Sequence, residues 1–318
     1  MKKLKRILAF LMALALLLAM TGCSRDKSSE RFSVWLIVKS TETQFWRAAF
    51  AGAKAAQAEY DVKLTIRGPG REEDYETQNF YIEDAVRNGA DAIVFSAISY
   101  EENAKAIDEA AEKGVRIIVI DSDVNSEKVA VRIGTDNAEA GRMAGAEVLS
   151  VPGENVNVGI VNYSAATWNG QERERGLREA LQDPRIHEII TINVLTEAAK
   201  ARASTEQLLR SHPEINVLVA LNEPLSVGAA QAVDKLKLQD KVHLVAFDTN
   251  VKCIDYLQTG AISALVVQNP YAMGYLGVEA ACSTRGNNSG DFINTPAVIV
   301  TKDTMFTPEG QKLLFPFG

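Results

Sequence analysis

Cysteine and histidine are scarce in this sequence, with three of each among 318 residues. The cysteines are Cys23, Cys253 and Cys282. The last two lie in separate predicted helices, so the three are a poor basis for a disulfide framework. The histidines are isolated from one another and from any cysteine pair, so there is no zinc-binding signature. The nucleophile elbow G-x-S-x-G and the phosphate-binding P-loop are missing as well. We therefore expect no metal, no cofactor and no catalytic residue.

An excess of basic charge is also missing. Lysine and arginine number 34 against 41 aspartate and glutamate residues, which gives a formal net charge of −7. Beyond the first residues no basic patch stands out in the sequence. This balance argues against nucleic acid as the main partner.

The longest apolar run, "ILAFLMALALLLAM" at residues 7–20, is too short to span a membrane comfortably. It follows the basic "MKKLKR" and precedes "TGC", which is the layout of an export signal over residues 1–22. The small residue before Cys23 resembles the lipobox of bacterial lipoproteins, with Met20 where leucine is usual. The resemblance implies cleavage before Cys23, lipidation of that residue, and a polar tether over residues 23–31. An uncleaved anchor and a plain secretory signal are the alternatives.

From Phe32 onward, short β-rich runs alternate with stretches of helical periodicity. Several of these helices end in glycine just before the next strand, as at Gly89, Gly114 and Gly260, which is typical of a left-handed helix end. Alternation of this kind predicts α/β architecture with parallel sheets and helices on both faces. Eleven strand candidates are too many for one open sheet, so we expect two doubly wound, Rossmann-like domains.

An aromatic pair opens the first predicted helix, directly after the strand "FSVWLIV". Thr41 and Gln44 have the spacing of a capping box at the start of this helix. Phe45 begins the stripe predicted to be buried, whereas Trp46 is rotated from it by about 100°. Both aromatics lie beside the carboxyl end of a strand, where ligands bind in open α/β sheets. We therefore expect Trp46 to contact a ligand and Phe45 to serve both core and site.

Polar side chains follow several other predicted strands in the same way. The strand-end residues are Asp121 with Asp123 behind it, Asn222, Asp248 and Gln268, and the helix after "VNVGIVN" brings Trp168 and Arg173. Any one of them could merely cap a helix or start a turn. Together, carboxylates, amides and a guanidinium suit the hydroxyls of a sugar or polyol, and an aromatic ring packs on its C–H face.

These residues stand in motifs that, in this order, resemble one known family. The motifs include "GVRIIVIDSD", "IGTDNAEAGRMAG", "ERERGLREAL", "LNEPLSVGAAQAV", "LVAFDTN" and "ALVVQNPYAMG". The chain from about residue 32 to 302 resembles the type I periplasmic binding proteins, in the sugar-binding group that includes ribose-binding protein. The resemblance implies two lobes joined by three crossovers, one of residues 32–135 plus 269–296 and the other of 136–268 plus 297–318. It also implies that the lobes close on a ligand.

By the same resemblance, seven residues fall on ligand-contacting positions: Phe45, Trp46, Asp121, Arg173, Asn222, Asp248 and Gln268. The chain departs from the ribose-binding pattern at Ser122, where arginine is usual, and at Lys39, where a small hydroxyl is common. An aromatic expected near Thr196 is also missing, and Trp168 is a candidate to replace it.

The charges of the predicted site bear on the ligand. Asp121, Asp123 and Asp248 against Lys39 and Arg173 give a site that is near neutral or slightly acidic. This balance favours an uncharged polyhydroxy ligand over a phosphorylated one.

The leading functional hypothesis is a monomeric, extracytoplasmic, lipid-anchored subunit that captures a monosaccharide or polyol for the permease of an ABC importer. The second is a receptor of the same fold that passes its ligand to a sensor kinase or chemoreceptor. An enzyme with Asp121 and Asp248 as an acid–base pair has no supporting nucleophile, metal or cofactor motif. A repressor would carry a DNA-binding helix-turn-helix where the export signal stands.

Overall fold

The computed structural model describes residues 31–283 and 291–315. The predicted export signal, Cys23 and all but the last residue of the predicted tether lie outside the described residues. From Phe32 onward the chain forms one compact unit. In the part of the chain that the structure describes, no helix combines the length and the apolar character needed to cross a bilayer.

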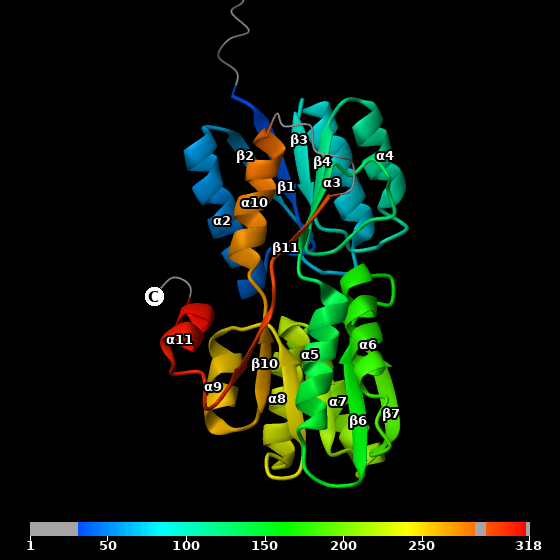
Figure 1. Ribbon diagram of the computed structural model, residues 1–318. Helices are drawn as coiled ribbons and strands as arrows, with labels where there is room; N and C mark the ends of the chain where they lie inside the picture. The colour runs from blue at the N-terminus through cyan, green and yellow to red at the C-terminus, as the bar shows by residue number, and fades with distance from the viewer. Residues whose placement is uncertain (1–30, 284–290, 316–318) are drawn as a thin grey trace, which may run out of the picture. The chain divides into compact units, whose positions relative to one another are not determined.

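The first of two six-stranded sheets is parallel throughout, in the order β11-β5-β4-β3-β1-β2 (Figure 1). Its strands are β1 (Ser33–Ile37), β2 (Lys63–Arg67), β3 (Ala92–Phe95), β4 (Arg116–Ile120), β5 (Val131–Gly134) and β11 (Asp291–Asn294). Its helices are α2 (Gln44–Tyr60), α3 (Tyr75–Arg87), α4 (Ala104–Glu112) and α10 (Pro270–Cys282). Helices α2 and α10 pack with one apolar cluster and α3 and α4 with another, so both faces of the sheet are covered. We call these elements the first lobe.

The second sheet has the order β12-β10-β9-β8-β6-β7. Its strands are β6 (Val156–Asn162), β7 (Ile186–Asn193), β8 (Val217–Ala220), β9 (His243–Phe247), β10 (Ala264–Val267) and β12 (Val298–Thr301). The helices of this second lobe are α5 (Asn137–Leu149), α6 (Trp168–Ala180), α7 (Ala198–Ser211), α8 (Glu223–Leu236), α9 (Val251–Thr259) and α11 (Pro308–Leu314). The prediction of two α/β lobes with parallel sheets is thus confirmed. β12 differs from the expected pattern because it pairs with β10 in the antiparallel sense.

Burial explains which strands were visible in the sequence. Every residue of β1, β3, β8 and β10 is buried, because helices cover both faces of the sheets. Apart from Ser33 at the start of β1, these strands are unbroken apolar runs. β11 was not predicted, and all four of its residues are exposed. An edge strand of this kind buries no face and leaves no apolar pattern in the sequence.

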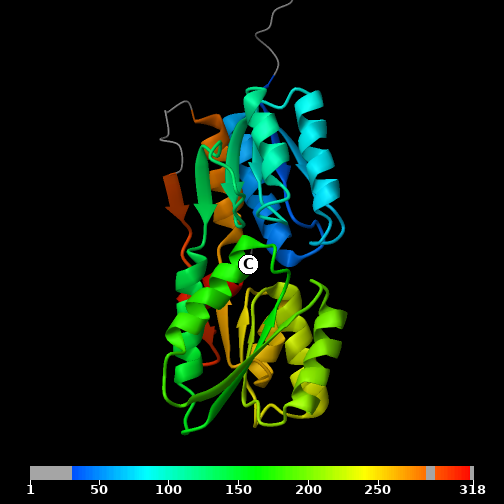
Figure 2. The ribbon, with the colours of Figure 1, turned by 90° about the vertical axis from the view of Figure 1, so that its right-hand side faces the viewer.

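Three connections carry the chain between the lobes (Figures 1 and 2). They join β5 to α5, β10 to α10, and β11 to β12. Helix α10 therefore returns from the second lobe to lie against α2 in the first. The two helices are close enough that a Cβ on Gly274 would stand 1.9 Å from the carbonyl oxygen of Ala49.

The ends of the helices agree with their sequence signals at the carboxyl side and differ at the start of α2. Gly89, Gly114 and Gly260 all have positive φ, as predicted for left-handed helix ends. The expected capping box at Thr41 and Gln44 is wrong. The helix begins at Gln44, and Thr43 is the N-cap whose hydroxyl accepts a hydrogen bond from the backbone N–H of Trp46 at 3.4 Å.

Candidate functional site

A cavity with an empty volume of about 280 Å³ lies where the carboxyl ends of strands from the two sheets face each other. The structure brings seven of the nine predicted site residues to its wall. Phe45 and Trp46 come from the first turn of α2, Arg173 from α6, and Asp121, Asn222, Asp248 and Gln268 from positions just after strands. Its wall combines aromatic rings with charged and amide side chains, which suits a small polar ligand.

Strained backbone marks two of these strand ends. Four non-glycine residues in the described ranges have positive φ, and two of them, Asp61 and Lys237, end helices α2 and α8. The other two are Asp121 with φ 59° and Asp248 with φ 67°, and both line the cavity. A left-handed aspartate costs on the order of 1 kcal/mol, and strain of this kind clusters at functional sites.

A buried cation dominates the first-lobe wall. Lys39 is 4% exposed, and its Nζ lies 3.3 Å from Oδ2 of Asp121 and 3.6 Å from Oε2 of Glu72. Burial acts to lower the pKa of the Lys39 ammonium, but Asp121 and Glu72 act in the opposite direction and the net pKa is raised. Ser96 donates from its hydroxyl to Asp121 at 2.9 Å, which holds the carboxylate in place. The ammonium is therefore permanently charged and fixed at the cavity.

Trp46 belongs both to the core and to the cavity. It is 1% exposed, lies in the apolar cluster of the first lobe, and makes an edge contact with Phe45 at a centroid distance of 5.0 Å. Its indole Nε1 donates to Oε1 of Glu72 at 3.0 Å. The ring is thus fixed at both its apolar and its polar sides before any ligand arrives.

Arg173 dominates the second-lobe wall and is 1% exposed. Its Nε donates to Oδ1 of Asn137 at 2.9 Å, and Nη1 donates to the carbonyl oxygen of Leu221 at 2.7 Å. The guanidinium stacks over the ring of Phe247 at 4.8 Å from the centroid. Nη2 has no hydrogen-bond partner although it is buried. A buried charged donor without an acceptor is costly, so this group is set to receive an acceptor in the cavity.

Asp248 is held beside this arginine by two short contacts. Gln268 donates from Nε2 to Oδ1 at 2.6 Å, and the backbone N–H of Glu223 donates to Oδ2 at 3.0 Å. Burial raises the pKa of Asp248 to about 6, although the charge of Arg173 acts in the opposite direction. Asn222 caps helix α8 through its side chain, so at this position the helix-cap alternative is also correct.

Two predicted site residues do not reach this cavity. Asp123 accepts from Nε of Arg132 at 2.9 Å with both carboxylate oxygens, and Trp168 stacks on Tyr100 at a centroid distance of 4.7 Å. Both residues line a second cavity with an empty volume of about 600 Å³, whose wall also includes Asp121. The polar partners of Asp123 and the ring partner of Trp168 explain why these side chains turn away.

Sequence reasoning missed other residues that line the first cavity. They are Thr43, Glu72, Tyr163, Asn169, Glu223 and Pro224, whereas Lys39 was noted only for its charge. Tyr163 and Glu223 follow strand ends closely and were visible by that criterion. Glu72 lies in the loop "GPGREED", which carries no strand or helix signal. With Glu72 and Glu223 added and Asp123 removed, the cavity has four carboxylates against two cations.

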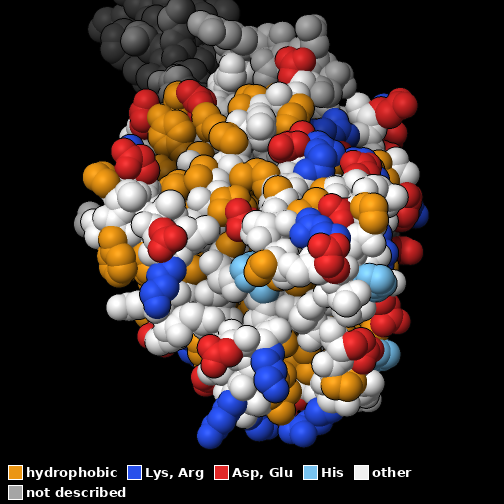
Figure 3. All heavy atoms as spheres, turned by 60° about the horizontal axis from the view of Figure 1, so that its bottom comes forward, with side chains coloured by type: hydrophobic (Ala, Val, Ile, Leu, Met, Phe, Trp, Pro, Cys, Tyr) orange, Lys and Arg blue, Asp and Glu red, His pale blue; other side chains and the backbone are white. Residues whose placement is uncertain are grey.

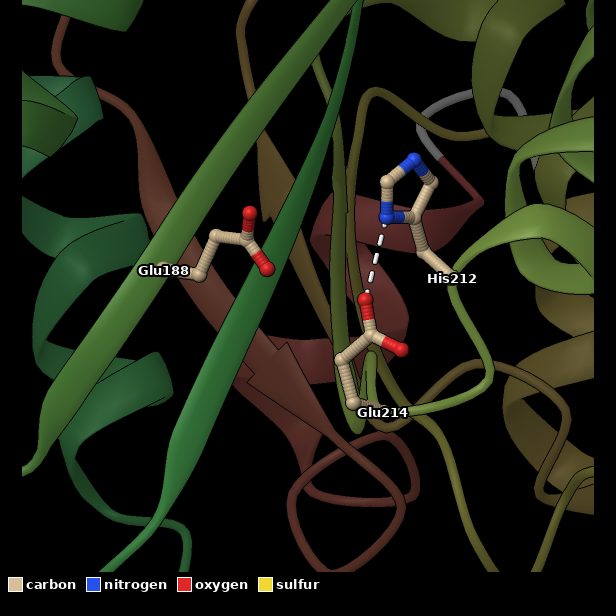
Figure 4. Close-up of side chains that lie close together, drawn as sticks. All are labelled: Glu188, His212 and Glu214. Carbon is tan, nitrogen blue, oxygen red and sulfur yellow. Dashed lines mark hydrogen bonds and ion pairs between the residues drawn. The ribbon is translucent and has the colours of Figure 1, made fainter.

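The end of the second lobe that faces the viewer in Figure 3 carries basic and acidic side chains interspersed with one another. On this lobe Glu188, His212 and Glu214 place possible metal-ligand atoms within 4.8 Å of one another (Figure 4). His212 Nδ1 already lies 3.0 Å from Oε1 of Glu214, and both glutamates are exposed. We assign no ion to this group.

Comparison with known proteins identifies the family to which this chain belongs. A model of the periplasmic binding protein domain matches residues 34–287, and the chain belongs to this family. With its two α/β lobes it is a type I periplasmic binding protein of the ribose-binding group. The family is one of binding proteins and not of enzymes.

Individual relatives match this chain over most of its length. The ribose import binding protein of Bacillus subtilis is 23% identical over 288 residues, covering 87% of this chain and 92% of that protein. A carbohydrate transporter solute-binding protein from Agrobacterium radiobacter, solved with D-arabinose, is 30% identical with a TM-score of 0.86, covering 91% of this chain and all of that one. A sugar transporter structure from Clostridium phytofermentans is 32% identical with a TM-score of 0.78, covering 86% of this chain and all of that one.

Proposed function

We propose that this chain is the extracytoplasmic, lipid-anchored solute-binding protein of an ABC importer and captures a neutral monosaccharide or polyol. The observation that carries the proposal is the buried, unpaired Nη2 of Arg173 in a small cavity between two lobes. A hydroxyl oxygen of a sugar would accept from this group, while its hydrogen would be donated to a neighbouring carboxylate.

The remaining polar groups of the wall support a ligand rich in hydroxyls. Asp121 and Asp248 are fixed acceptors, and Lys39 lies farther from its carboxylates than a normal hydrogen bond and retains donor capacity. Trp46 supplies an apolar surface for the C–H face of a sugar ring. Four carboxylates against two cations disfavour a phosphorylated or otherwise anionic ligand.

The relatives support the same substrate class and the transport role. One of them is a ribose import binding protein, and another was solved in complex with D-arabinose. For this chain, the ligand-contacting set that we propose is Phe45, Trp46, Asp121, Arg173, Asn222, Asp248 and Gln268, with Lys39, Glu72 and Asn169 added. Asp123 and Trp168 are left out because they line the other cavity.

The anchor, the lobe limits and the partners are part of the proposal. Residues 1–22 serve as the export signal, and Cys23 carries the lipid that holds the monomer at the membrane. Residues 32–135 plus 269–296 and 136–268 plus 297–318 move as the two lobes and close on the sugar. The loaded protein then delivers its sugar to the permease subunits.

A thermal-shift panel of neutral sugars, polyols, sugar phosphates and amino acids tests the ligand class. A true ligand at 100 times its dissociation constant should stabilise the protein by about 2.7 kcal/mol. Calorimetry should then show weaker binding for Arg173→Lys, which keeps the charge but loses the forked donors. Arg142→Lys is the matched control, because Arg142 is paired with glutamates on the exposed side of α5. If only amino acids or amines raise the melting temperature, the sugar assignment is wrong.

A further inference from the structure

A single carboxylate of the second lobe holds the start of a helix in the first lobe. Oε2 of Glu223 accepts from the backbone N–H of Phe45 at 2.8 Å, and Oε1 accepts from that of Gln44 at 3.2 Å. Asn250 steadies the same carboxylate by donating from Nδ2 to Oε1 at 2.9 Å. Glu223 is the first residue of α8, and Gln44 is the first residue of α2. This contact therefore joins two helix N-termini across the lobes.

Helix α2 needs this partner because its own sequence supplies little at that end. The first N–H groups of a helix have no partner within the helix, and the helix dipole favours negative charge there. No acidic residue stands in the first turn of α2, and the hydroxyl of Thr43 accepts only from the N–H of Trp46. The N–H groups of Gln44 and Phe45 thus depend on a carboxylate that belongs to the other lobe.

The contact is buried and has a reciprocal partner. Glu223 is 7% exposed, and burial raises its pKa even though Asn250 and the two backbone N–H groups act to lower it. In return, the side-chain Oε1 of Gln44 accepts from the backbone N–H of Val251, the first residue of α9, at 3.2 Å. Each lobe therefore completes a helix start in the other.

Glu223 is also linked to residues of both lobes that line the candidate ligand cavity. Its backbone N–H donates to Asp248 at 3.0 Å, and the helix turn that it caps carries Phe45 and Trp46. Any movement that separates the lobes breaks the carboxylate contact and shifts the aromatic pair relative to Asp248. Cavity and contact are thus mechanically linked.

We propose that Glu223 is a positioning residue that stabilises the closed arrangement of the lobes and so sets how long a bound sugar stays. This inference rests on the proposed function. The bonds of Glu223 to Gln44 and Phe45 exist only where the lobes meet, so they oppose the opening that a bound sugar needs in order to leave. The specific consequence is that sugar dissociates more slowly from the wild type than from a variant that lacks this contact.

The test uses Glu223→Gln, which keeps the shape of the side chain but replaces one acceptor oxygen by a donor. With the best sugar of the panel, stopped-flow tryptophan fluorescence should show dissociation about tenfold faster in Glu223→Gln and association no slower than in the wild type. Glu206→Gln is the matched control, because that carboxylate pairs with Lys235 inside the second lobe. Unchanged dissociation in Glu223→Gln, or a loss confined to association, would overturn the proposal.

Hydrogen exchange of the ligand-free protein gives a second, independent readout. The amides of Gln44 and Phe45 should exchange at least about fivefold faster in Glu223→Gln, and those of Ala53 and Ala56 should be unchanged. Equal exchange at Gln44 and Phe45 in the two proteins would overturn the proposal even if no sugar bound. If the wild type binds no sugar but the exchange difference is present, the proposed function fails while the contact role of Glu223 stands.

Discussion

The affinity for a neutral sugar should fall as the pH drops through 6, because Asp248 must be ionised to accept from ligand hydroxyls. Burial raises the pKa of Asp248 from its usual 3.8 to about 6, and Arg173 only partly offsets this effect. If protonated Asp248 does not bind, affinity falls tenfold for each pH unit below 6, which gives about tenfold weaker binding at pH 5 than at pH 7.

The stability of the ligand-free protein should respond in the opposite sense. A carboxyl whose folded pKa is raised favours folding in its protonated form. Its contribution is fully present below about pH 4 and is lost as the pH rises through 6. A pKa that is higher by about two in the folded protein corresponds to about 3 kcal/mol in the free energy of unfolding. Acidification from pH 7 should therefore stabilise the fold through Asp248 while it weakens sugar binding.

Isothermal titration calorimetry between pH 5 and 8 on wild type and Asp248→Asn measures the first effect. The variant should bind at least about tenfold more weakly at pH 7 and should lose the part of the pH dependence due to Asp248. Burial raises the pKa of Glu223 as well, but Glu223 is present in both proteins. The difference between the two proteins in how affinity changes with pH is therefore due to Asp248. Asp123→Asn should keep the wild-type dependence of affinity on pH, because Asp123 does not line the first cavity. A flat wild-type profile from pH 5 to 7 would refute the reasoning.

Three further outcomes are expected. Trp46→Ala should lower the free energy of unfolding by about 3–5 kcal/mol in urea titrations, because Trp46 is a core residue. The folded fraction of this variant should bind sugar more weakly by about 1–3 kcal/mol. Normal sugar affinity in that fraction would show that Trp46 serves the core alone. Cys23→Ser should abolish metabolic labelling with a fatty acid, and persistent labelling would contradict the lipobox interpretation. Gly274→Ala should destabilise the protein by about 1–3 kcal/mol or more in calorimetric melts, because its Cβ would meet the α2 backbone, whereas Gly70→Ala, with open space around it, should be nearly neutral.

The parts of the fold that could be predicted are those in which burial imposes a pattern. Strands such as β4 are covered on both faces, so after Arg116 the chain must supply an unbroken apolar run, "IIVI". β11 carries no such requirement because it lies at the edge with every residue exposed. The antiparallel direction of β12 depends on where the third connection re-enters the second lobe, which its apolar run does not encode.

The candidate site was predictable where a strand alone determines the position of a side chain. Asp121 and Asp248 directly follow buried strands, and the sheet carries them to the cavity. Asp123 stands three residues past the end of β4, and its partner Arg132 on β5 decides the direction of its side chain. Glu72 reaches the cavity from a loop, so its position follows from contacts between segments far apart in the sequence.

The return of α10 to the first lobe has a consequence for the synthesis of the protein. Ala49 and Gly274, whose helices pack against each other, are separated by most of the chain. At a translation rate of roughly 5–20 residues per second, the apolar face of α2 waits roughly ten to forty-five seconds for its cover to be made. The first lobe therefore cannot complete itself while the ribosome is still producing the second. The proposed export signal would therefore act on a chain whose first lobe still lacks α10.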